Sequence, residues 1–132
     1  MYTLKRSLAG LFAVLAMLIA PLAALAAPQH PFSEQAFQAA QDAGKPVLIE
    51  IHADWCPTCR AQLPILNKLS AEAAYSGIER LRVDFDSQKS VVKRFKATTQ
   101  STLVLYKGKI EIARSVGETD ESRIRAMLDK AR

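Results

Sequence analysis

The sequence predicts an α/β fold in which helices cover both faces of a central mixed β-sheet. Two observations lead to this prediction. Strand-like apolar segments alternate with helical segments over residues 33–100, a pattern typical of parallel strands that are joined by helices. Two further strand-like segments then meet at a glycine, which predicts an antiparallel hairpin at one side of the same sheet.

The first 26 residues have the pattern of a secretory signal peptide and stand outside the predicted domain. A short positive region precedes an apolar run at residues 8–20, and Ala24 and Ala26 are small residues of the kind that a signal peptidase reads. We expect cleavage after Ala26, which places a single domain, residues 27–132, in the periplasm. The alternative is an uncleaved membrane anchor facing the periplasm, because about 20 apolar residues span a bilayer.

A helix and a buried strand are expected to open the domain. Ser33 is a good N-cap for the helix, and Phe32 and Phe37 flank it as a hydrophobic staple does. Gly44 ends this helix. The next segment, PVLIEIHA at residues 46–53, has six apolar residues out of eight, which predicts a strand that is covered on both faces.

The rest of the domain continues the alternation. In order, we expect a helix at 57–75, a strand at 78–86, a helix at 87–97, a hairpin within 101–117 and a helix at 119–132. Gly77 ends the first of these helices, Gly108 lies at the hairpin turn, and Thr119 is the expected N-cap of the last helix.

Composition and charge argue against a nucleic-acid partner. The chain has 132 residues, of which 23% are charged, and a formal net charge of +5. Its basic residues are scattered, whereas a nucleic-acid-binding surface gathers them into a stripe with aromatic residues between them. We therefore expect an ordinary solvated surface and no nucleic-acid partner. We separately expect the protein to be a monomer.

The two cysteines of the chain, Cys56 and Cys59, form a CxxC motif. A disulfide between them closes a very small loop and stabilises little, so a purely structural role is disfavoured. A structural zinc site needs four ligands, and the sequence offers His30 and His52 but no second pair at ligand spacing. We therefore expect no metal, and redox chemistry in which the dithiol itself is the redox centre without a further cofactor.

The position of the motif between a strand and a helix supports redox chemistry. Cys56 comes just before the predicted helix, whose unpaired N–H groups favour a thiolate, the form that attacks disulfides. Cys59 lies one turn inside the helix and is expected to be the more buried of the two. It is placed to attack the mixed disulfide and release the reduced substrate.

The segment PVLIEIHADWCPTCRAQLPIL resembles the active-site segment of the thioredoxin family. The matching residues are Ala53, Trp55, Cys56, Cys59, Arg60 and Pro64. The similarity continues through LRVDFD, which resembles the next strand, and STLVLYKGK, which resembles the hairpin. The resemblance implies a thioredoxin-like fold and thiol–disulfide oxidoreductase activity, with Cys56 as the attacking and Cys59 as the resolving cysteine.

The resemblance also implies roles for residues around the cysteines. Glu50 falls where the family keeps a buried acid, and we expect it to accept the proton of Cys59. Arg82 falls where the family often has a lysine near that acid. The alternatives are a glutamate at the strand edge that reaches solvent and an arginine that is a surface charge. Substrate contacts are expected at Trp55, Pro57, Thr58, Gln100 and Ser101.

One position departs from the family pattern. Thioredoxins have a cis-proline in the loop that faces the CxxC motif and pairs with the substrate backbone, and here Ser101 stands at that place after Gln100. A cis bond before serine costs about 3 kcal/mol, so we expect a trans bond. Either the loop keeps its shape with this bond, or the altered loop opens the site to a metal shared between two chains.

The residues around the second cysteine bear on the direction of electron flow. Thr58 stands where strongly oxidising relatives usually carry a histidine, and Arg60 is expected to lower the thiol pKa somewhat. We therefore expect a moderately reducing protein that acts on disulfides of exported proteins and receives electrons from a membrane protein. The alternatives are a periplasmic oxidant or isomerase of the same fold, and a non-catalytic binding module or metal carrier.

Overall fold

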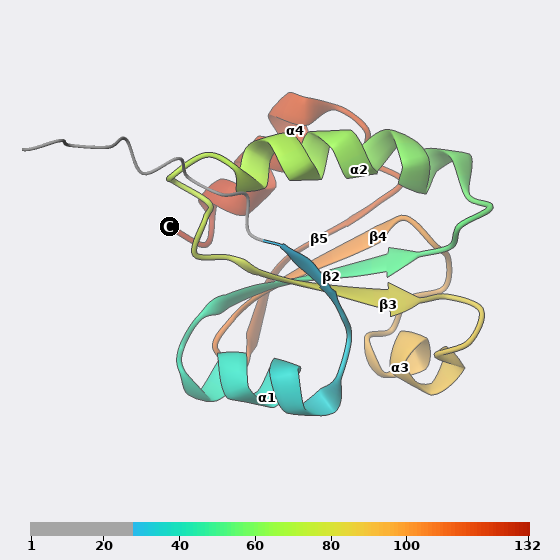
Figure 1. Cartoon of the computed structure of the whole chain (residues 1–132), viewed down its shortest axis with the longest axis horizontal. Helices are drawn as coiled ribbons and strands as arrows, with labels where there is room; N and C mark the ends of the chain where they lie inside the picture. Colours follow the sequence, from blue (N-terminus) through green and yellow to red (C-terminus); the bar gives the residue numbers. More distant parts are fainter. Residues whose placement is uncertain (1–27) are drawn as a thin grey trace, which may run out of the picture.

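The computed structural model describes residues 28–132, so the predicted signal peptide lies outside the described residues (Figure 1). The elements follow one another as β1 (Gln29–Pro31), α1 (Glu34–Asp42), β2 (Pro46–His52), α2 (Pro57–Ser70), β3 (Glu79–Asp84), α3 (Lys89–Arg94), β4 (Thr102–Lys107), β5 (Ile110–Val116) and α4 (Glu121–Asp129). Within residues 28–132, none of these helices combines the length and the apolar character that a membrane crossing requires.

The strands form one mixed sheet in the order β1-β3-β2-β4-β5. β3 runs parallel to both β1 and β2, whereas β4 runs antiparallel to β2 and to β5. Figure 1 shows α2 and α4 on one face of the sheet and α1 and α3 on the other. The predicted fold class, a mixed sheet with helices on both faces, is therefore confirmed, and the apolar segment before the cysteines is the central strand β2.

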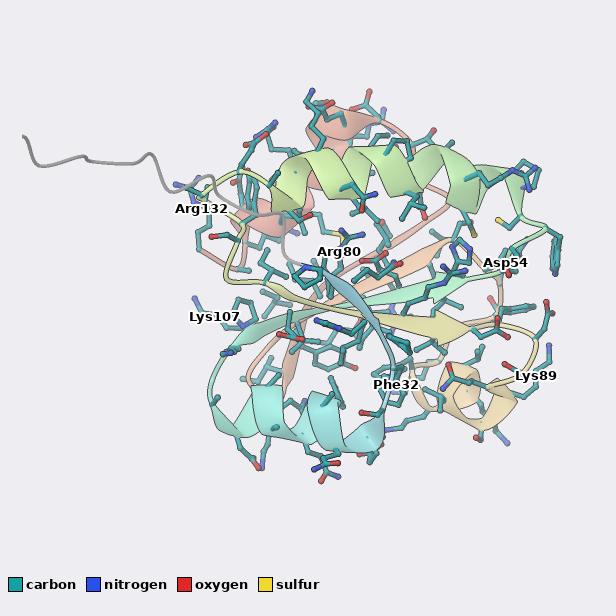
Figure 2. The ribbon with its side chains drawn as sticks, viewed as in Figure 1. Phe32, Asp54, Arg80, Lys89, Lys107 and Arg132 are labelled. Carbon is teal, nitrogen blue, oxygen red and sulfur yellow. The ribbon has the colours of Figure 1, made fainter. Side chains whose placement is uncertain are left out.

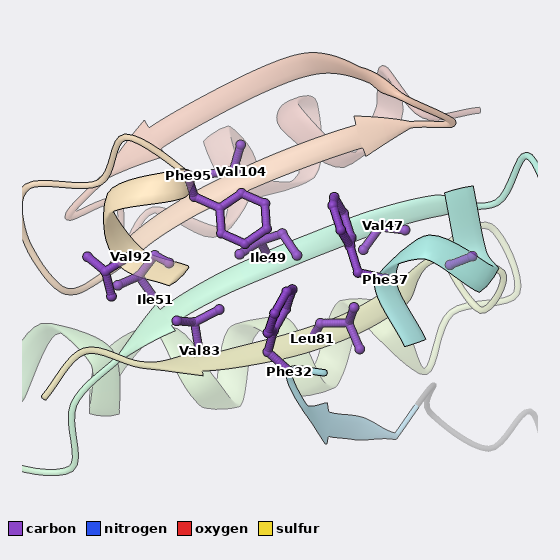
Figure 3. Packing of buried hydrophobic residues seen from close by; sticks show 11 residues of the cluster. Phe32, Phe37, Val47, Ile49, Ile51, Leu81, Val83, Val92, Phe95 and Val104 are labelled. Carbon is purple, nitrogen blue, oxygen red and sulfur yellow. The ribbon is translucent and has the colours of Figure 1, made fainter. Parts of the chain in front are cut away.

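Each face of the sheet carries its own apolar core because side chains alternate along the strands. Ile49 and Ile51 of β2 point toward α1 and α3, where they join a cluster that includes the rings of Phe32, Phe37 and Phe95 (Figure 3). On the other face, the buried residues beneath α2 and α4 include Leu48, Leu66, Leu69, Leu103, Leu105, Ile124 and Leu128. The two cores leave β2 covered on both sides, as its sequence predicts.

The helix caps agree with the sequence at α1 and differ at α4. Ser33 Oγ accepts the N–H of Ala36 at 3.1 Å, which confirms the predicted cap of α1. Asp120, rather than Thr119, caps α4, and its carboxylate accepts the N–H of Arg123 at 3.0 Å. The prediction of Thr119 was wrong because a carboxylate is favoured at a helix N-terminus both as an acceptor and as a negative charge.

Two features of the chain were not predicted. β1 is a three-residue edge strand that pairs with Arg80–Arg82 of β3, and so short a segment has no recognisable alternation. α2 ends at Ser70 rather than at residue 75, although the following residues favour a helix. The turn after it is held by Tyr75, which is buried and donates its hydroxyl to Asp129 Oδ1 at 2.8 Å. This long-range contact cannot be seen in the local sequence.

Candidate active site

Cys56 occupies the N-cap of α2, between the end of β2 and the first helical turn. Its backbone is extended (φ −79°, ψ 114°), and its Sγ accepts the N–H of Cys59 at 3.1 Å. Pro57 takes the first helical position, where a missing N–H removes no helical hydrogen bond. The strand–helix junction therefore places the first sulfur at the start of the helix, as the sequence predicts, where it accepts one of the N–H groups that have no partner within the helix.

The two cysteines are free thiols and both are buried. Cys56 is 1% exposed and Cys59 is 3% exposed, so the expectation that Cys59 is the more buried was wrong. Ala53 forms a small apolar cluster with the two cysteines, and the half-buried Phe85 packs against this cluster. Burial, followed by the hydrogen bond with Cys56, raises the pKa of Cys59 to about 11. Cys59 therefore keeps its proton near neutral pH.

Residues 99–101 form the Ser101 loop, and the backbone of Ser101 contacts the Cys59 thiol. Ser101 donates its N–H to the carbonyl of Ile51 at 2.8 Å, and its own carbonyl accepts the side-chain amide of Gln62 of α2 at 3.2 Å. Within residues 28–132 no peptide bond is cis, which confirms the trans bond predicted before Ser101. Ser101 has a φ of 56°, a left-handed conformation that is uncommon for a residue other than glycine.

Glu50 lies in β2 and is held by a buried network of polar side chains. Arg80 Nε donates to Glu50 Oε1 at 2.6 Å, and Arg80 Nη2 donates to Oε2 at 3.2 Å. The side-chain amide of Gln29 donates to the same carboxylate. Arg80 Nη1 in turn donates to Asn67 Oδ1 at 2.9 Å and to Ser70 Oγ at 3.1 Å, both on α2. Figure 2 shows Arg80 between α2 and the sheet.

The arginine beside the buried acid is Arg80, so the assignment of Arg82 to this place was wrong. Arg82 is opposite Glu50 in the register of β2 and β3, while Arg80 is opposite Leu48. The side chains of these two pairs lie on the same face of the sheet. The long side chain of Arg80 therefore reaches Glu50 diagonally across the two strands. Arg82 instead donates to the exposed carboxylate of Asp54.

The structure decides the burial of Glu50 but not its predicted role. Glu50 is 4% exposed, which excludes the alternative of a glutamate that reaches solvent. Within the described part of the chain, no hydrogen bond joins it to Cys56 or Cys59. Its role as the acceptor of the Cys59 proton therefore stays a prediction.

A second cluster of titratable side chains, made of His52, Asp54 and Arg82, lies at the end of β2, and sequence reasoning missed it. His52 is buried, and its Nε2 lies 3.2 Å from Asp54 Oδ1. Burial and then the charge of Arg82 lower the pKa of His52, although the Asp54 carboxylate opposes this. His52 is therefore neutral near neutral pH. In residues 28–132, no three His, Cys, Asp or Glu side chains come together as metal ligands would.

The surface around the cysteines is formed by the other residues that the sequence singles out. Trp55 is 56% exposed, and its Nε1 donates to Asp86 Oδ2 at 2.7 Å. Pro57 is exposed, while Thr58 and Gln100 are half-buried. Contacts of these residues with a substrate stay predictions, although their positions beside the CxxC motif agree with that role.

Comparison with known proteins agrees with the geometry of the site. The model of the Thioredoxin family matches residues 29–130. The chain belongs to the thioredoxin family. As a member of that family it is a thiol–disulfide oxidoreductase with a CxxC pair. Thioredoxins act on disulfide-containing proteins and need no cofactor beyond their redox-active dithiol.

Relatives of this thioredoxin-family protein are found in several bacteria. The chain is 34% identical to the thioredoxin of Chlamydia trachomatis serovar D over 84 residues, which cover 64% of this chain and 80% of the relative. It is 31% identical to thioredoxin C-2 of Corynebacterium nephridii over 100 residues, or 74% and 91% of the two chains. The crystal structure of Trxlp from Edwardsiella tarda EIB202 superimposes with a TM-score of 0.73 at 42% identity, covering 74% of this chain and 95% of that one.

Proposed function

We propose that this protein reduces disulfides of exported proteins in the periplasm and receives its electrons from a membrane protein. The Cys56 thiolate attacks a client disulfide and forms a mixed disulfide, and one client sulfur leaves as a thiolate. Cys59 loses its proton and attacks the Cys56 sulfur, which releases the second client thiolate. The resulting disulfide between the two cysteines is then reduced by two electrons from the membrane donor.

The asymmetry of the cysteine pair is the observation that carries these roles. Cys56 Sγ accepts a backbone N–H at the start of α2, while burial and the contact with Cys56 raise the pKa of Cys59 to about 11. One sulfur is therefore placed as the nucleophile and the other as a protonated thiol that waits for the second step. Glu50 is proposed as the acceptor of that proton, and it would act while paired with Arg80.

The surroundings of Cys56 favour a reductant over an oxidant. Strong oxidants of this kind stabilise their reduced form, and a cation beside the thiolate contributes to that. Here Thr58 carries no charge, and the guanidinium of Arg60 donates to the carbonyl of Asp54 at 3.1 Å. We expect a potential of about −270 mV when the protein is equilibrated with glutathione, whereas about −120 mV would identify an oxidant.

Reduction of insulin disulfides tests the enzymatic role directly. The purified protein should reduce insulin with a dithiol as the electron source, and the Cys56→Ser variant should not. A non-catalytic binding module or metal carrier would show no difference between the two proteins. Such a result would reject the proposed function.

Two further measurements address export and partners. Amino-terminal sequencing of the protein from a periplasmic fraction should begin at Ala27, and a chain that keeps residues 1–26 in the membrane fraction would instead identify an anchor. The Cys59→Ser variant cannot complete the second step, so it should accumulate mixed disulfides with its clients and its electron donor. Absence of any trapped protein would contradict a reductase of exported proteins.

A further inference from the structure

Three consecutive carbonyl groups of the Ser101 loop accept hydrogen bonds from within the protein. The Thr102 hydroxyl donates to the carbonyl of Thr99 at 2.8 Å. The hydroxyl of Ser101 donates to the carbonyl of Gln100 at 2.6 Å. The carbonyl of Ser101 accepts the N–H of Gly117 at 3.0 Å. Each carbonyl oxygen of the loop therefore already accepts a hydrogen bond, either from a side chain of the loop and its flanking strand or from a neighbouring segment.

This loop lies beside the second cysteine, because the backbone of Ser101 contacts the Cys59 thiol. Its Ser101 is tied to Ile51 at the end of β2 and to Gln62, which lies one turn after Cys59 on α2. A client sulfur that is bound to Cys56 brings its flanking backbone past the half-buried Gln100. An extended segment in such a place gains affinity by pairing its N–H groups with free carbonyls of the protein.

We infer that Ser101 is a specificity-determining residue whose hydroxyl competes with the client backbone for the carbonyl of Gln100. A carbonyl oxygen has two lone pairs, so this competition weakens backbone pairing and does not abolish it. The protein then selects a client by the exposure of its disulfide more than by an extended segment around it. This inference rests on the proposed function and adds a substrate class to it, namely disulfides exposed on the surface of clients.

A pair of matched probes separates backbone pairing from thiol chemistry. One probe is a linear peptide of several residues whose central cysteine carries a thionitrobenzoate disulfide, and the other is N-acetylcysteine amide with the same disulfide. In both cases the Cys56 thiolate attacks the cysteine sulfur and releases coloured thionitrobenzoate, and Cys59 then releases the cysteine thiolate. The two probes differ only in the flanking backbone. With the reduced protein in excess and a single turnover, the ratio of their second-order rate constants for thionitrobenzoate release therefore reports pairing with that backbone.

The Ser101→Ala and Ser101→Gly variants both remove the hydroxyl but differ in their tolerance of the left-handed backbone. We expect the ratio of peptide to amide probe to rise by about threefold to tenfold in both, as the gain of one hydrogen bond allows. An unchanged ratio, or a rise in the glycine variant alone, would overturn the inference. Failure of the unaltered protein to react with the amide probe would instead contradict the proposed function.

Discussion

Arg80 and Glu50 form an ion pair that is buried between the sheet and α2, with side-chain exposures of 2% and 6%. The pair joins β2 to β3, and its further hydrogen bonds reach Asn67 of α2 and Gln29 of β1. The free-energy cost of removing two charges from water offsets much of the free energy that their attraction contributes. The pair therefore matters for stability chiefly because neither charge can be left alone in the interior.

Removal of one partner of this pair should be strongly destabilising. Arg80→Met keeps much of the side-chain length but leaves the Glu50 carboxylate buried without its cation, and we expect a loss of about 3–5 kcal/mol in the free energy of unfolding. Arg82→Met is the matched control. Its partner Asp54 has an 87% exposed side chain, so its loss should be below about 1 kcal/mol. Urea unfolding followed by circular dichroism measures both.

The double variant Glu50→Leu/Arg80→Met isolates the interaction. If the charges depend on each other, this variant should lose less stability than the sum of the two single variants. Additive losses, or equal losses for Arg80→Met and Arg82→Met, would show that the buried pair does not act as a unit.

The stability of the reduced protein should fall as the pH rises through the alkaline range. The pKa of Cys59 is raised from 9.0 to about 11, mainly by burial. Between these values the unfolded chain loses a proton that the folded protein keeps, so the unfolded state gains stability with rising pH. Urea unfolding from about pH 8 to about pH 11 should therefore show a steeper decline for the reduced protein than for Cys59→Ser. Parallel profiles would mean that Cys59 ionises as readily in the folded protein as in the unfolded chain.

Local signals in the sequence were sufficient for most of the fold and for the position of the cysteines. The apolar segment of β2, the N-cap Ser33 and the hairpin glycine Gly108 each act within a few residues. The same is true of the strand–CxxC–helix arrangement that makes Cys56 an N-cap. Such features depend on backbone preferences and periodicity, which a single sequence contains.

The parts that could not be predicted depend on how distant segments meet. The choice of Arg80 over Arg82 depends on the register of two parallel strands and on the reach of a side chain across it. The burial of both cysteines depends on distant segments, because Phe85 packs against them and the backbone of Ser101 contacts Cys59. Strand β1 forms by pairing with the edge of β3, which is distant in the sequence.

The hydrogen bond between Trp55 and Asp86 should fix the only tryptophan of the chain at the active-site surface. Asp86→Ala removes the acceptor of the indole N–H and should shift the emission maximum of Trp55. Because both groups are largely exposed, the free energy of unfolding should change by less than about 1 kcal/mol. Asp42→Ala serves as the control, since Asp42 is an exposed carboxylate that contacts Lys109 instead. Identical emission spectra for both variants and the unaltered protein would contradict a fixed indole.

The cap of α4 provides a test of the structure at a second site. Asp120→Ala removes the carboxylate that accepts the N–H of Arg123 at 3.0 Å, and it should lower the urea midpoint of unfolding. Thr119→Ala is the matched control, because Thr119 does not cap the helix, and we expect a change within about 0.5 kcal/mol.

The loss of stability in Asp120→Ala should shrink below about pH 4, since a protonated aspartate is a poorer acceptor and carries no charge to interact with the helix dipole. The hydrogen bonds that Asp120 accepts lower its pKa, with that from Ser122 contributing most, so this change is expected on the acidic side of the usual aspartate range. A larger loss for Thr119→Ala than for Asp120→Ala in urea unfolding would show that the helix begins one residue earlier.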